Sequence, residues 1–186
     1  MADGQPTNGA NHADFQLNKD GESIGIFTAR GGLIDAIRFA GQQKGVSEGR
    51  FPDGSTNITR FPDTATPGAR NLLPLAGVVI NEVLTQSDVP FEDAIELRNL
   101  TAGAVDLSYW YLSDSQKEPR KFRIPNGTFL APGGFLVFYE NQFNPITGGN
   151  PSFALSSVHG DSVFLFTGDA AGNLSGFRTG VKFGPA

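Results

Sequence analysis

Apolar and polar residues alternate along two runs in the middle of the chain, residues 77–84 and 95–99. Side chains of a strand point alternately to its two faces, so this period of two predicts a pair of β-strands. In the first run one face would carry Val78, Ile80, Glu82 and Leu84, and the other Val79, Asn81 and Val83. In the second run Ile95, Leu97 and Asn99 would share a face, and the polar residues 86–93 between the runs predict a loop. The single tryptophan, Trp110, follows and predicts an aromatic anchor for a β-sandwich core.

The same period predicts a hairpin nearer the N-terminus, with strands at 22–27 and 33–39. Its turn is glycine-rich, which suits the positive φ values of tight hairpins. Leu33, Ile37 and Ala40 also have helical spacing, but the flanking glycines and the short run favour a strand.

The rest of the N-terminal part carries weaker signals. Residues 1–13 are polar and rich in Gly and Asn, which predicts a disordered tail. Residues 45–70 are turn-rich, with Phe51, Ile58 and Phe61 as separate apolar anchors. Residues 71–76 contain a proline and are predicted to be a linker.

Composition supports an all-β fold and excludes several classes of function. Sixteen Phe residues lie among 24 Gly and 12 Pro, which is typical of short strands separated by turns. The net charge of −5 argues against a nucleic-acid partner, because phosphate binding needs a basic face. The absence of Cys excludes disulfides and thiolate zinc sites. No apolar run is long enough for a membrane span, and residues 1–14 lack the pattern of a signal peptide.

An ordered set of short motifs runs through the second half of the chain. It comprises I-N-E-V at 80–83, I-E-L-R-N at 95–99, V-D-L-S-Y-W-Y-L-S-D at 105–114, F-R-I-P-N-G at 122–127 and L-A-P-G-G-F-L-V at 130–137. This order resembles the bacterial lamin tail domain family. The resemblance implies an immunoglobulin-like antiparallel β-sandwich that binds or scaffolds, without family-wide catalytic residues. The motif positions singled out here are Asn81, Glu82, Glu96, Asn99, Trp110, Asp114, Pro125 and Gly127.

The two ends of the chain also resemble each other. F-Q-L at 15–17 matches F-A-L at 153–155, and G-E-S-I-G-I-F-T at 21–28 matches G-D-S-V-F-L-F-T at 160–167. Residues 14–70 are therefore predicted to be the C-terminal part of a first lamin-tail-like unit. Residues 77–186 would be a second unit, without a counterpart of the closing segment that follows residue 39. The sequence is interpreted as a fragment of a larger, repetitive protein.

This arrangement predicts a contact between the two parts. A sandwich without its closing segment exposes a sheet edge, which is unfavourable. We expect part of 45–62, anchored by Phe51, Ile58 or Phe61, to pack against 77–186, with the hairpin 22–39 left over at the edge. The alternative is that 1–70 forms a separate, poorly packed lobe.

Candidate catalytic and metal-binding residues have structural explanations. Glu82 and Glu96 on adjacent strands could form a carboxylate pair, but Glu82 is expected to be partly buried against a backbone amide or Arg98. The acidic loop with Asp88, Glu92 and Asp93, and the turn at 169–173, supply too few oxygens for calcium. His12 and His159 are expected to be loop residues. No catalytic, cofactor-binding or metal-binding residue is assigned, and no cofactor is expected.

Exposed aromatic residues could instead form a sugar-binding platform. Trp110 with Tyr109 and Tyr111 is one candidate, but alternation predicts that Trp110 lies in the core. A core position is likewise expected for Phe135, Phe138, Phe143, Phe164 and Phe166.

Three hypotheses for function follow. The first is a non-catalytic binding or scaffolding module of a larger, exported or cell-surface bacterial protein. Its partners would be other domains of the same polypeptide or another protein. The second is a carbohydrate- or calcium-binding accessory module of an attached hydrolase, which exposed aromatic rings or clustered oxygens on one sheet face would favour. The third is an enzyme, which would need a pocket joining Glu82, Glu96 and His159.

Overall fold

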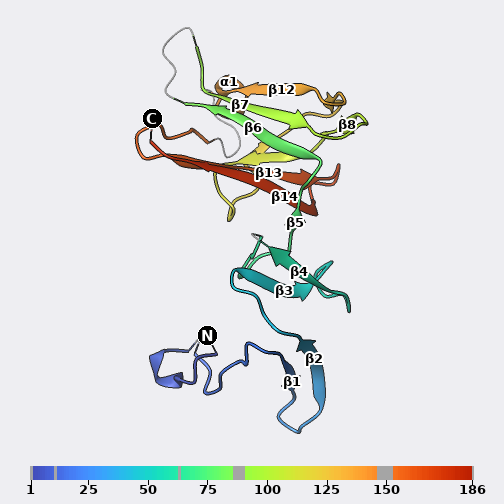
Figure 1. The fold of residues 1–186 in the computed structure, drawn as a ribbon, viewed down its shortest axis with the longest axis vertical. Helices are drawn as coiled ribbons and strands as arrows, with labels where there is room; N and C mark the ends of the chain where they lie inside the picture. The colour runs from blue at the N-terminus through green and yellow to red at the C-terminus, as the bar shows by residue number, and fades with distance from the viewer. Residues whose placement is uncertain (1, 11, 63, 86–90, 146–152, 186) are drawn as a thin grey trace.

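The computed structural model of the protein describes residues 2–10, 12–62, 64–85, 91–145 and 153–185, and within these ranges it is dominated by β-strands (Figure 1). The strands are β1 Glu22–Phe27, β2 Leu33–Phe39, β3 Val46–Arg50, β4 Ile58–Pro62, β5 Leu73–Pro74, β6 Val78–Leu84, β7 Ala94–Asn99, β8 Val105–Asp106, β9 Tyr111–Ser113, β10 Phe122–Arg123, β11 Phe129–Leu130, β12 Phe135–Tyr139, β13 Asp161–Gly168 and β14 Leu174–Phe183. One helical turn, α1, spans Glu140–Phe143, and a 3-10 turn, η1, spans Pro6–Asn8. None of the helices in the described ranges is long and apolar enough to cross a membrane.

Two sheets face each other in the C-terminal part of the chain (Figure 1). One sheet has the strand order β10-β9-β13-β14-β5 and the other β12-β7-β6. Their facing sides bury one apolar cluster that includes Val78, Ile95, Leu97, Leu112, Phe138, Val163 and Leu165. This confirms the predicted all-β, immunoglobulin-like antiparallel β-sandwich.

The predicted faces of β6 are wrong after Ile80, because the strand contains a β-bulge. Ile80 pairs with Leu97 and Glu82 with Glu96, so Asn81 is an extra residue without a partner on β7. A bulge of one residue reverses the alternation beyond it. Val83 therefore packs on the core, whereas Glu82 is exposed on the outer face.

The aromatic side chains also divide differently from the prediction. Trp110 is partly buried and packs against the apolar cluster of the core. It lies in a turn before β9, where its amide donates to the carbonyl of Leu107 at 3.1 Å, so strand alternation does not govern it. Its neighbour Tyr111 is buried instead, in a second cluster with Leu72 and Phe166. Phe135 is exposed on the outer face of β12, although Phe138 and Phe143 are buried as predicted.

Residues 45–76 contain more structure than the sequence indicated. Strands β3 and β4 form a hairpin in which Phe61 is buried and Ile58 is exposed. The residues predicted as a linker include β5, which pairs in parallel with β14. The ring of Phe51 meets that of Phe177 on β14 edge-on, with centroids 6.2 Å apart. The β3–β4 hairpin thus contacts the sandwich as expected, while its role as a substitute closing segment stays a prediction.

The hairpin β1–β2 has the predicted strand limits and forms a two-stranded sheet. In Figure 1 it lies at the opposite end of the molecule from the sandwich, with β3–β4 between them. In the N-terminal tail, the described residues include η1 and a contact of 2.6 Å between His12 Nδ1 and Asp3 Oδ2. Disorder of this tail stays a prediction.

Candidate functional site

The outer face of the sheet β12-β7-β6 carries two rows of side chains set by strand register. Glu96 on β7 lies between Glu82 on β6 and Val137 on β12. One step along the strands, Ala94 lies between Leu84 and Tyr139. Ala94 is small and its two neighbours are large, so the sheet surface is hollowed at Ala94.

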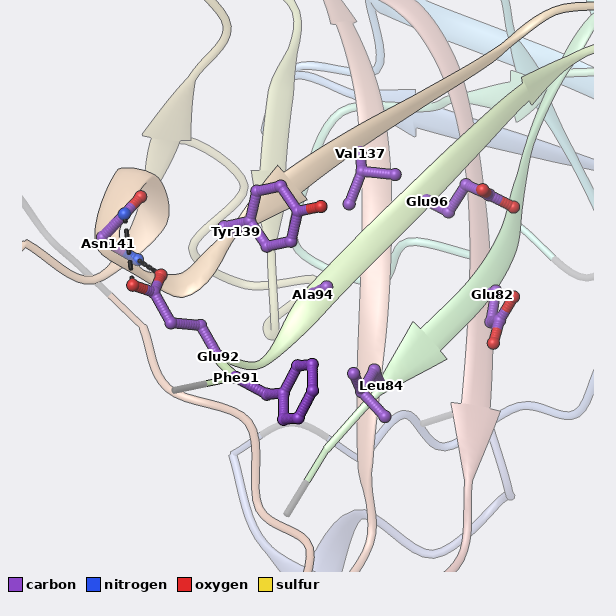
Figure 2. Close-up of a pocket in the computed structure, with 9 residues that line it drawn as sticks. All are labelled: Glu82, Leu84, Phe91, Glu92, Ala94, Glu96, Val137, Tyr139 and Asn141. Carbon is purple, nitrogen blue, oxygen red and sulfur yellow. Dashed lines mark hydrogen bonds between the residues drawn. The ribbon is translucent and has the colours of Figure 1, made fainter. Parts of the chain in front are cut away.

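These two rows line a groove of about 500 Å³. Figure 2 shows Glu92 and Asn141 at one end of it and Glu82 and Glu96 at the other, with Phe91 and Leu84 between them. The groove is lined by Glu82, Leu84, Phe91, Glu92, Ala94, Glu96, Val137, Tyr139 and Asn141. Leu84, Phe91 and Tyr139 are all exposed. The groove therefore combines an apolar rim with carboxylates.

Glu82 and Glu96 are cross-strand partners on β6 and β7. Like charges in this arrangement repel and are unfavourable. Glu96 accepts a hydrogen bond from Asn81 Nδ2 at 2.7 Å, a bond that the bulge makes possible. The sequence predicts Glu82 partly buried against a backbone amide or Arg98, but this side chain is exposed. Arg98 instead stacks over Phe135, with its guanidinium carbon 5.0 Å from the ring centroid.

At the other end of the groove, away from Glu82 and Glu96, hydrogen bonds connect Glu92 to the helical turn α1. Glu92 accepts hydrogen bonds from the backbone amide of Asn141 at 3.1 Å and from Asn141 Nδ2 at 3.3 Å (Figure 2). The backbone amide of Glu140 donates to the carbonyl of Asp93 at 2.8 Å. Glu92 is thus fixed at the groove, whereas Asp88 of the predicted acidic loop lies outside the described residues.

The histidine and the turn considered for catalysis and for calcium binding lie outside the groove. His159 lies in the turn before β13, where its amide donates to Ser156 Oγ at 3.3 Å, and it is not among the described residues that line the groove. Asp169 and Asn173 close the tight turn between β13 and β14, as predicted. Within the described ranges, no group of three or more His, Asp or Glu side chains could hold a metal ion.

Most of the remaining motif positions stabilise the sandwich. Asn99 is fully buried and donates to the carbonyls of Gly103, Leu130 and Ala131 at 2.7 to 3.1 Å. Asp114 pairs with Lys121 at 2.6 Å, and this hydrogen bond raises the pKa of Lys121.

The turn between β10 and β11 contains the last two motif positions. Thr128 donates to the carbonyl of Pro125 at 2.8 Å. The amide of Gly127 donates to Ser108 Oγ at 2.9 Å. Both bonds hold the turn in place rather than forming a binding surface.

Sequence reasoning brought Glu82 and Glu96 together but missed the apolar rim of the groove. Leu84 was expected on the same face as Val78, and no function was considered for Phe91 or Tyr139. The period-two pattern of β12 does put Tyr139 on the same face as Phe135 and Val137, so the sequence contained that signal.

Comparison with known families agrees with the fold. The Lamin Tail Domain family model matches residues 74–179, which is more than half of the chain. The match begins in β5 and ends within β14, and it contains both sheets of the sandwich. No curated protein matches the chain. The chain belongs to the lamin tail domain family.

Proposed function

We propose that this chain is a non-catalytic binding module whose partner docks on the outer face of the sheet β12-β7-β6. The groove on that face carries the proposal, because it joins exposed apolar side chains to carboxylates in one concavity. Pockets and interfaces of this kind use apolar contacts for affinity and a few polar groups for orientation.

The charges in the groove suit a partner that brings a cation. Glu82, Glu92 and Glu96 line the groove, and its described lining contains no lysine or arginine. A lysine or arginine placed between Glu82 and Glu96 would remove their mutual repulsion and form charge-assisted hydrogen bonds. Leu84, Phe91 and Tyr139 would contact apolar side chains beside it. The proposed partner is therefore a basic, partly apolar segment of another protein or domain.

A carbohydrate ligand is the second candidate, favoured by a different observation. The exposed rings of Phe91 and Tyr139 stand beside carboxylate and amide oxygens on one sheet face. Aromatic faces can cover the apolar side of a sugar ring while the oxygens bind its hydroxyls.

Titration of the isotope-labelled chain with two kinds of probe separates these candidates. The probes are short lysine- and arginine-containing peptides with one aromatic residue, and a panel of neutral oligosaccharides. We expect the peptides to shift the backbone NMR signals of β6, β7 and β12, with affinity falling as salt rises. Glu82→Gln and Glu96→Gln should each weaken this binding several-fold, and Asp14→Asn, in the exposed tail, should not.

The other outcomes are equally definite. Salt-insensitive binding of an oligosaccharide that Tyr139→Ala abolishes would establish the second candidate and overturn the first. If neither probe shifts signals at the groove, the groove is not a binding site for either class.

The proposal includes a setting in a larger, exported or cell-surface bacterial protein. The family resemblance and the internal repeat support this setting, and the partner could then be another domain of the same polypeptide. Protease treatment of intact cells of the source organism tests the location. Cleavage without lysis is expected, and full protection until lysis would contradict it.

A further inference from the structure

The hairpin β1–β2 has the same register as β13–β14. Five consecutive pairs correspond, from Glu22↔Phe39 with Asp161↔Phe183 to Ile26↔Asp35 with Leu165↔Thr179. A register shift follows in both hairpins, after Ile26 in one and after Phe166 in the other. The similarity of the two sequences is therefore matched by their strand pairing.

The glycine before each hairpin is also equivalent. Gly21 and Gly160 both have positive φ, 116° and 70°. A Cβ on Gly21 would lie 3.0 Å from the carbonyl oxygen of Phe39, and a Cβ on Gly160 would collide with that of Phe183. Each glycine thus lets the chain pass close to the end of the second strand.

The two hairpins differ sharply in burial. Ile26 is 60% exposed whereas its counterpart Leu165 is 0% exposed. Phe27 is 59% exposed whereas Phe166 is 1% exposed. Phe15 and Leu17, which precede the hairpin, are exposed as well, although their counterparts Phe153 and Leu155 are buried. The N-terminal hairpin thus carries apolar side chains at positions that are buried in β13–β14, but here these side chains are exposed.

The second hairpin shows what covers such a face. Strand β9 pairs along the edge of β13, with Leu112 opposite Leu165 and Tyr111 opposite Phe166. The sheet β12-β7-β6 packs over the inward side chains, including Val163 and Leu165. Among the described strands, β1 pairs with β2 only. A two-stranded hairpin is marginal without further strands or a packed face.

We infer that β1–β2 occupies the place of β13–β14 in another lamin-tail sandwich and binds the strands that precede this hairpin there. The occupant is a polypeptide segment equivalent to β5–β12, which lays a strand like β9 along the free edge of β1. Its second sheet covers Ile24, Ile26 and Ile37. This is strand addition combined with burial of an apolar face. A second copy of this chain does not supply the segment, because its own β5–β12 already hold β13–β14.

Extending the chain tests this inference. A copy of residues 71–152 is joined directly ahead of Phe15, replacing residues 1–14, so that β1–β2 follows a full set of opening strands. Amide exchange in β1 is then expected to become at least about tenfold slower than in the original chain. Ile26→Lys should abolish this protection, because a charge would enter the new core. Ile26 is exposed in the original chain, so a lysine there leaves the hairpin itself intact.

The matched control is Ser23→Glu, which lies on the other face of β1 opposite Arg38. It should keep the protection in the extended chain. Unchanged exchange on extension, or protection that Ile26→Lys does not reduce, overturns the inference.

Sedimentation of the original chain tests the competing occupant. We expect a monomer over a wide concentration range. A dimer that Ile26→Lys disperses and Ser23→Glu does not would show that a second copy covers the hairpin, and this result would also overturn the inference.

Discussion

At the scale of single residues, the buried side chain of Asn99 links several loops of the sandwich by hydrogen bonds. Its side-chain amide donates to three carbonyls, and its oxygen accepts from the amide and hydroxyl of Thr101. Asn99→Ala would remove these bonds, including the buried one to the carbonyl of Leu130, so the free energy of unfolding should fall by about 2–4 kcal/mol. Urea unfolding measures this. Asn126→Ala, at an exposed site, serves as the control and should change stability little.

The pair Lys121–Asp114 makes a prediction about pH. The hydrogen bond raises the pKa of Lys121 in the folded protein above its ordinary value of 10.5. Its stabilising contribution is therefore complete below pH 10.5 and is lost as pH rises through the raised pKa. The stability difference between the parent and Lys121→Met should be constant from neutral pH to about pH 10 and shrink above it. Lys117→Met is the control and should show no such change with pH. If the stability difference between the parent and Lys121→Met persists unchanged above about pH 10, the ion pair with Asp114 does not supply it.

The sequence marks residues such as Asn99 and Asp114 but not the partners that they bind. Asn99 and Asp114 stood in the ordered motifs, but a motif does not state which carbonyl or cation a side chain meets. Strand alternation predicts Trp110 in the core. The structure places it in a turn, where the next residue, Tyr111, enters the strand and is buried. Residue type predicts burial on average, whereas the limits of a strand decide it at a given position.

At the scale of elements, the bulge in β6 determines which side chains line the groove. The residues of β7 from Ala94 to Asn99 are paired without a gap, so Asn81 is the one extra position in its partner strand. Deletion of Asn81 should preserve every other pair and both faces of β6. We expect the free energy of unfolding to fall by no more than about 1 kcal/mol, the value of one exposed hydrogen bond.

Deletion of Glu96 is the matched control in the central strand. It would change the pairing register of part of β7 with both β6 and β12 by one residue. Core residues of that part would then point to the surface. This variant should fail to fold or unfold at much lower urea concentration. If the Asn81 deletion behaves in the same way, the bulge is required for the fold and the register argument is wrong.

The strands β1, β2, β6 and β7, with six or seven residues each, were predictable, because apolar residues recur at every second position in much of their length. Strands β5, β8, β10 and β11 have two residues each, which is too short for any periodicity. The hairpin β3–β4 was missed because Pro and Gly surround it. The bulge was also invisible, because V-V-I-N-E-V-L fits a regular strand equally well.

At the scale of the whole molecule, the repeat predicted a contact between 45–62 and the sandwich but not the strand on which it forms. The β3–β4 hairpin is joined to the chain ahead of β5 by a hydrogen bond from Asn71 Nδ2 to the carbonyl of Arg50 at 2.9 Å. Pairing of β5 with β14 then keeps this hairpin near the sandwich. A parallel pairing of two residues leaves no pattern in the sequence, so the docking site could not have been predicted.

The contact between Phe51 and β14 decides whether β3–β4 supports the sandwich. Its ring lies against Gly176, where a Cβ would be 2.8 Å from the ring, and it meets Phe177 and Phe61 edge-on. If the hairpin substitutes for a closing segment, Phe51→Ala should lower the free energy of unfolding by about 1–2 kcal/mol, the value of two aromatic contacts. Amide exchange at 174–178 should accelerate at the same time, since the edge of β14 would open to water. Ile58→Ala, on the exposed part of β4, should change neither quantity. Exchange in β14 that stays at the parent rate in Phe51→Ala would mean that β3–β4 is a separate lobe resting against a complete sandwich.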